Sequence, residues 1–178
     1  MKNIWLVLLC LSTYFMSCKK KPVEKPGGCM DIHSPLYNST AEVDDGSCKY
    51  IYAVEYEITS FPSKKSDGGD WDWDLTGLTI DPDLILYINK EGSSEYSYTS
   101  PAINNVSIED EIIWTSTDQF KMLNEVWQWS LYDSDLDDDD LVAEGTFNPV
   151  SQYTSDYISL TSDDGNTTLK LYIDLRDE

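Results

Sequence analysis

The sequence predicts an all-β fold for residues 50–178: an eight-stranded antiparallel β-sandwich. Short stretches in which apolar and polar residues alternate recur along this region, and a period of two is typical of half-buried strands. Segments rich in Gly, Asp, Asn and Ser separate these stretches, and such residues favour turns. About eight short strands in a region of this length indicate a sandwich.

The strands can be placed one by one. Tyr56 and Ile58 alternate with glutamates in the first strand, and Leu84, Leu86 and Ile88 mark the second. Asp164-Gly165-Asn166 is a hairpin signal between the last two. Residues 118–124 are expected to form one or two helical turns. The eight predicted strands cover residues 52–58, 84–88, 95–99, 111–115, 126–132, 141–147, 157–160 and 168–174.

The first 17 residues have the pattern of an export signal, with a charged Lys2 followed by a short apolar core. Residues 15–18, Phe-Met-Ser-Cys, resemble the lipobox of bacterial lipoproteins. The resemblance implies that Cys18 carries lipid and anchors an outer-membrane lipoprotein that faces the periplasm or the cell surface. An ordinary secretory signal is the alternative. Residues 18–28 contain a run of lysines and several Pro and Gly, which indicates a flexible tether.

Two cysteines remain in the exported part of the chain, Cys29 and Cys48. An even pair in an oxidising compartment predicts a disulfide, which would staple residues 29–49 into a small module. Closing a loop of that length stabilises a fold by roughly 3 kcal/mol. The run Asp44-Asp45-Gly46-Ser47-Cys48 resembles a short module that recurs in bacterial surface and secreted proteins.

The chain is strongly acidic, with 33 Asp and Glu against 12 Lys and Arg and a net charge of −21. Nucleic acid is therefore excluded as a partner, because phosphate contacts require Lys and Arg. The carboxylates are concentrated in two predicted loops, residues 67–83 and 133–140. Oxygen ligands without nearby His or Cys favour calcium or magnesium, and flexible acidic loops favour Ca²⁺. The alternative is that the run at 137–140 is only solvated surface.

Three local matches make residues 51–178 resemble the calcium-dependent C2 domain. Residues 81–88 resemble the strand entry that closes the first calcium loop of a C2 domain. Residues 131–135 resemble the strand exit that opens the third calcium loop, and residues 141–145 resemble the strand that follows this third loop. The resemblance implies that Asp83, Asp133, Asp135 and Asp138 are calcium ligands.

The chain departs from the C2 pattern in both acidic loops. Asp139 or Asp140 must replace a ligand that would fall on Leu141, and one of Asp70, Asp72 and Asp74 must supply the first-loop ligand. An EF-hand-like spacing within residues 133–144 is coincidental, because Asp138 stands where that loop requires Gly. The predicted metal set is Asp74, Asp83, Asp133, Asp135, Asp138 and Asp140.

These patterns predict a non-catalytic binding module anchored in a membrane. His33 is the sole histidine and lies in the Cys module, so a Ser-His-Asp or Cys-His site in the sandwich is excluded. The expected partner at the acidic loops is phospholipid or another surface protein. The alternative is a carbohydrate-binding sandwich with structural calcium. Its glycan platform would be Trp71 and Trp73, with Tyr96 or Tyr98, unless the two tryptophans fold back over the sandwich end.

Overall fold

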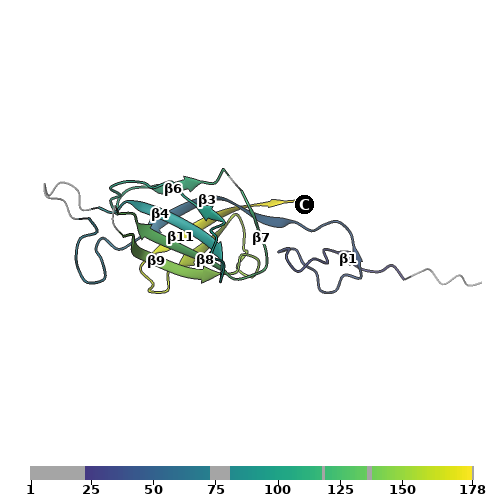
Figure 1. Cartoon of the computed structure of the whole chain (residues 1–178). Helices are drawn as coiled ribbons and strands as arrows, with labels where there is room; N and C mark the ends of the chain where they lie inside the picture. Colours follow the sequence, from purple (N-terminus) through teal and green to yellow (C-terminus); the bar gives the residue numbers. More distant parts are fainter. Residues whose placement is uncertain (1–22, 73–80, 118, 136–137, 178) are drawn as a thin grey trace, which may run out of the picture.

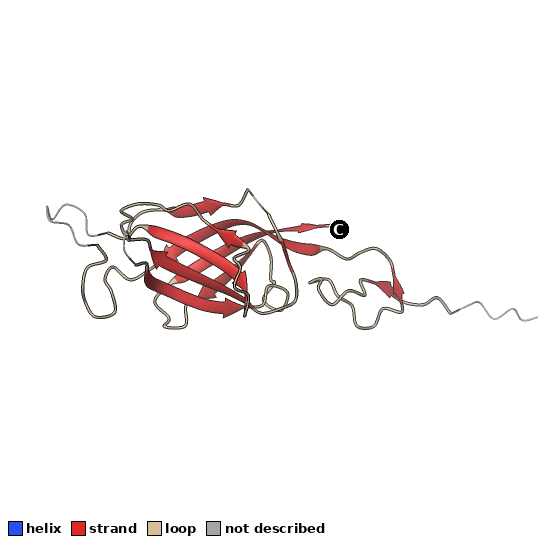
Figure 2. Ribbon diagram, viewed as in Figure 1, coloured by secondary structure: helices blue, strands red, loops and turns tan. Residues whose placement is uncertain are grey.

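The computed structural model describes residues 23–72, 81–117, 119–135 and 138–177, and these form only strands, turns and loops (Figure 2). Two antiparallel sheets pack into a sandwich, and a small parallel sheet lies in the N-terminal module (Figure 1). Within these ranges, no helix of the length and apolarity needed to cross a membrane is found. The expected signal segment and Cys18 lie outside the described residues.

The sandwich strands are β3 (Tyr50–Ser60), β4 (Leu84–Lys90), β5 (Tyr98–Thr99), β6 (Ile112–Thr115), β7 (Lys121–Met122), β8 (Trp127–Asp133), β9 (Asp140–Phe147), β10 (Tyr157–Thr161) and β11 (Thr168–Arg176). One sheet has the order β10-β11-β3-β6, and β7 pairs with the same edge of β3 as β6. The other sheet has the order β5-β4-β8-β9. The all-β antiparallel sandwich is therefore confirmed.

The predicted number of strands is wrong. Each of the eight predicted segments overlaps a strand, but the described residues contain eleven, including β1 (Gly27–Gly28) and β2 (Val43–Asp44) of the N-terminal module. The ninth sandwich strand, β7, replaces the helical turns expected at 118–124. Met122 is fully buried and pairs with Ile51, so its apolar surface joins the core. A strand of two residues is too short to show alternation in a sequence.

A bulge in β3 interrupts the alternation expected for the first strand. Ala53 pairs with Ile173 of β11 and Glu55 with Tyr172, which leaves Val54 without a partner on that strand. An extra residue of this kind shifts the faces of the strand by one position. Ile51 and Ala53 are therefore buried before the bulge, and Tyr56 and Ile58 after it.

The N-terminal module is closed by the predicted disulfide between Cys29 and Cys48, whose Cα atoms lie 4.7 Å apart. The module contacts the sandwich at the loop before β8. The backbone N–H of Asn124 donates to Nδ1 of His33 at 3.2 Å, and its side-chain amide donates to the carbonyl of Ile32 at 2.9 Å. This module and the acidic loops lie at opposite ends of the sandwich (Figure 1).

Gly145 provides a test of how tightly β9 packs against Trp129 of the neighbouring strand β8. A Cβ at this position would lie 2.8 Å from Nε1 and 3.2 Å from Cε2 of Trp129, which is fully buried. We expect Gly145→Ala to lower the free energy of unfolding by about 1–3 kcal/mol, because the indole has no room to move. Chemical denaturation measures the loss. Gly27→Ala is the control, since its Cβ would meet Asp45 at 3.4 Å, an ordinary contact. Equal stability of the two variants would contradict this packing.

Candidate functional site

The site is built on the end of strand β8. Trp127, Trp129 and Leu131 alternate along this strand and are buried in the core. Asp133 is the next residue in the same register and pairs with Leu84 of β4. Since side chains two residues apart on a strand point to the same face, a carboxylate occupies a core-facing position. None of its surface is exposed.

Only one oxygen of this carboxylate has a partner among the described residues. Oδ1 of Asp133 accepts the backbone N–H of Asp83 at 2.7 Å. Oδ2 is buried and has no hydrogen-bond partner in the described part of the chain. Burial raises the pKa of Asp133 to about 6, and the neighbouring charges of Asp135 and Asp72 also raise it. The folded protein therefore disfavours a negative charge here unless a cation is near.

Two further carboxylates converge on Asp133. One oxygen each from Asp72, Asp133 and Asp135 lie within 4.8 Å of one another. Partial burial raises the pKa of Asp72, as do a hydrogen bond with Asp135 and the charges on Asp135 and Asp83. The donor set fits a hard divalent cation, because it consists of oxygens and includes a buried oxygen without a partner.

Lys65 is a basic residue close enough to this cluster for its charge to lower the pKa of Asp133 and Asp72. Its Nζ pairs with Oδ2 of Asp140 at 2.5 Å. The pKa of Lys65 is raised first by the hydrogen bond to Asp140, and the charges of Asp135 and Asp133 add to the shift. Lys65 supplies part of the positive charge that the buried carboxylate requires.

The structure brings together only part of the predicted metal set. Asp133 and Asp135 meet, and Asp72 joins them from the first acidic loop. Asp83 lies beside them, but its Oδ1 accepts the backbone N–H of Asn105 at 2.7 Å. Asp138 is exposed, and Asp140 faces Lys65. Asp74 lies outside the described residues.

Sequence reasoning left the first-loop ligand open among Asp70, Asp72 and Asp74, and no sequence signal separates them. Asp70 pairs with Lys64 at 2.5 Å, whereas Asp72 follows a buried tryptophan that directs the loop towards β8. The position of Trp71 in the core therefore brings Asp72 to the cluster.

Trp71 does not form an exposed platform but folds back over the end of the sandwich. Only 4% of its surface is exposed, and its indole Nε1–H donates to the carbonyl of Pro62 at 2.9 Å. The indole packs against the sandwich core, so an exposed Trp71 platform is wrong. Trp73 lies outside the described residues. Tyr98 is turned inwards and stacks on Tyr56, with ring centroids 4.3 Å apart, whereas Tyr96 is exposed.

Comparison with known proteins places C2 domains among the similar structures. A solved C2 domain shares 16% identity at a TM-score of 0.46, over 71% of this chain and 97% of that one. The calcium-bound pair of C2 domains from Extended-Synaptotagmin 2 shares 18% at 0.45, over 72% and 44% of the two chains. Human GIVD cytosolic phospholipase A2 shares 12% at 0.46, over 73% of this chain and 18% of that one.

No protein-family model matches the sequence, and no curated protein does so significantly. The similar structures share few residues with this chain and have TM-scores below 0.5. A functional proposal must therefore depend on the side chains of this chain itself.

The buried carboxylate predicts an unusual dependence of stability on pH. With Asp133 at a pKa of about 6 when folded and an ordinary value when unfolded, the folded state binds more protons between about pH 4 and pH 6. Stability from this group therefore falls as pH rises through that window. We expect Asp133→Asn, measured in chelator, to be more stable than wild type at pH 7 by about 2–3 kcal/mol and similar to it at pH 4.

Denaturant melts of the two proteins between pH 4 and pH 7 measure this difference. Comparing them cancels carboxyls with lowered pKa values such as Glu57, which contribute in the opposite direction. A stability difference that did not change with pH would show that Asp133 is not held out of water.

Proposed function

We propose that this chain is a non-catalytic binding module, anchored to a bacterial outer membrane through lipid on Cys18, that docks through its acidic loop end with the help of Ca²⁺. The observation that carries the proposal is the buried Oδ2 of Asp133, which has no hydrogen-bond partner among the described residues and lies close to two other carboxylates. A cation bound there by Asp72, Asp133 and Asp135 would remove the energetic cost of burying that charge.

Calcium suits this site better than magnesium. Asp72 and Asp135 lie on loops rather than on strands, and Ca²⁺ accepts six to eight oxygens in flexible arrangements, whereas Mg²⁺ demands a near-ideal octahedron. Asp83 is close enough for its charge to raise the pKa of Asp72. It is therefore available as a further ligand if its contact to Asn105 rearranges. Binding would also relieve the self-repulsion of a chain with net charge −21.

A binding role fits the side chains better than catalysis. The single histidine lies at the contact between the N-terminal module and the sandwich. About the length of strand β8 separates this contact from the acidic cluster. The cluster itself offers carboxylates and one lysine already paired with Asp140. This set can hold a cation and present it to a phosphate or carboxylate of a partner, so phospholipid or an acidic surface protein is the expected partner.

Thermal melting tests the ion. Extracellular modules bind Ca²⁺ with dissociation constants of roughly 10⁻⁴ to 10⁻³ M. At an excess of about a hundredfold over that constant, the ion would stabilise the fold by about 2.7 kcal/mol and raise Tm by several degrees. Asp133→Asn should lose most of this gain, since it removes a charge while keeping an oxygen for the Asp83 amide.

Asp156→Asn is the matched control, because this residue is exposed and lies outside both acidic loops. It should keep the full calcium-dependent shift. If the wild-type melt does not respond to millimolar Ca²⁺, the acidic loops are solvated surface and the proposal fails.

Replacing Cys18 tests the anchor and then permits a docking assay. We expect Cys18→Ala to move the chain from the membrane fraction to the soluble fraction, because acylation of that sulfur is what holds it. The soluble variant should then sediment with phospholipid vesicles in Ca²⁺ and remain in solution in chelator. Membrane association that persists in Cys18→Ala with chelator present would argue against both the lipid anchor and calcium-dependent docking.

A further inference from the structure

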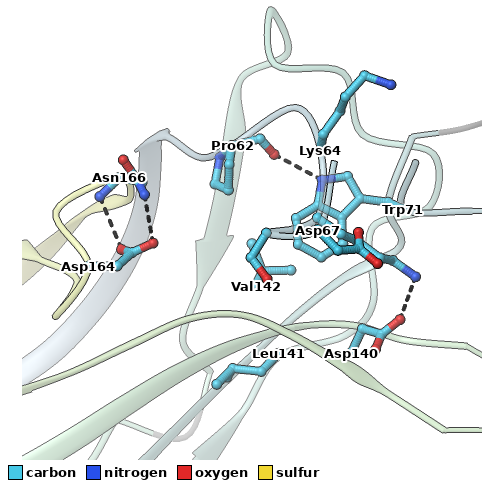
Figure 3. Close-up of a pocket in the computed structure, with 11 residues that line it drawn as sticks. Pro62, Lys64, Asp67, Trp71, Asp140, Leu141, Val142, Asp164 and Asn166 are labelled. Carbon is cyan, nitrogen blue, oxygen red and sulfur yellow. Dashed lines mark hydrogen bonds and ion pairs between the residues drawn. The ribbon is translucent and has the colours of Figure 1, made fainter. Parts of the chain in front are cut away.

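A separate pocket is lined by residues that include Lys65 and its partner Asp140 (Figure 3). Its volume is about 270 Å³. Three segments form it: the loop of residues 61–71, the start of β9 and the turn that joins β10 to β11. Asp72, Asp133 and Asp135 are not among its lining residues, so the pocket is distinct from the candidate cation site.

One wall of the pocket is apolar. Trp71 lines it only with the 4% of its surface that is exposed, and its indole is held in place by the hydrogen bond to the Pro62 carbonyl. Val142 lies beside it because β9 has a bulge there: Leu131 pairs with Ala143 and Tyr132 with Leu141, so Val142 is left over and turns inwards. Leu141 is 45% exposed and borders the pocket.

The remaining walls carry charges of both signs that are already paired. Lys64 pairs with Asp70 and Lys65 with Asp140, each at 2.5 Å. On the opposite side, the amide of Asn166 donates to Oδ2 of Asp164 at 2.8 Å (Figure 3). Each ammonium group has three donors, and Asp140 has about four acceptor sites, so one pair each leaves capacity for a ligand. Asp164 also accepts the hydroxyl of Ser162 and the backbone N–H of Asn166, so it has less free capacity.

The segment that carries the lysines is held in a defined conformation. The N–H of Lys65 donates to the carbonyl of Gly69, and the N–H of Gly68 to the carbonyl of Lys65, at 3.0 and 2.9 Å. Gly68 has a φ of +88°, which glycine adopts without strain. The side chain of Asp67 closes the turn by accepting the N–H of Gly69 at 2.9 Å. Little ordering would therefore accompany binding.

From these observations we infer that the pocket binds a neutral saccharide. A ligand of either charge would meet both lysines and carboxylates, whereas a neutral ring bearing many hydroxyls can donate to the carboxylates and accept from the ammonium and amide groups. The C–H face of such a ring suits the exposed side chain of Leu141 and the small exposed parts of Trp71 and Val142. The inference goes beyond the proposed function, and it does not depend on a bound cation.

Nuclear magnetic resonance of the full chain in detergent micelles tests the inference through the indole N–H resonance of Trp71. The probes are glucose, galactose, mannose and N-acetylglucosamine, with glucuronate and inorganic phosphate as anionic counterparts. We expect at least one neutral sugar to shift this resonance saturably, with a dissociation constant on the order of millimolar, and the anions to shift it less. The same result is expected in chelator, which separates this site from calcium binding.

Two matched variants locate the binding. Leu141→Arg places a long side chain across the mouth of the pocket without disturbing the core, and it should weaken sugar binding by about tenfold or more. Ile108→Arg makes the same type of change at a residue that is 59% exposed and does not line the pocket, and it should leave binding unchanged. The inference is overturned if no neutral sugar shifts the resonance, if an anion binds more tightly, if chelator abolishes binding, or if the two variants bind alike.

Discussion

A carboxylate in a core-facing position of a β-strand is the constraint on which this end of the molecule depends. Asp133 continues the stripe of Trp127, Trp129 and Leu131 on β8, so its direction is set by packing. Trp129 lies against Gly145 of the neighbouring strand with no room to spare. The carboxylate cannot turn into water unless this packing loosens, and a buried ion without compensation is costly. The surrounding loops must therefore bring positive charge or hydrogen-bond donors to it.

The loop of residues 61–72 meets this requirement and also shapes the neighbouring pocket. Consecutive residues have different roles: Trp71 fills the end of the core, and Asp72 joins the carboxylate cluster. Lys65 lies 5.9 Å from the centre of the Trp71 ring and pairs with Asp140. A change in this loop would therefore alter both the cluster and the pocket, because the buried indole of Trp71 contacts the pocket and precedes Asp72 in the chain.

Much of the fold can be predicted from the sequence, but fine placement cannot. Alternation located eight strands, and the strand exit at Asp133 and Asp135 identified two residues of the cluster. Alternation could not show the bulges at Val54 and Val142, since each is defined by the register of a partner strand. Nor could it show that Asp72, rather than Asp70 or Asp74, joins the cluster, or that Trp71 is buried. Those outcomes depend on space at the sandwich end, which is a tertiary property.

The contact between Asn124 and the N-terminal module places that module at one end of strand β8. Asn124 lies just before the start of β8, while Asp133 ends it, and seven strand residues span about 20 Å. A chain held by its N-terminus is thus attached at one pole and carries its carboxylate cluster at the other. Under the proposed anchoring through Cys18, the surface that the cluster meets would be one that faces the anchoring bilayer, and the molecule would bridge the gap between the two.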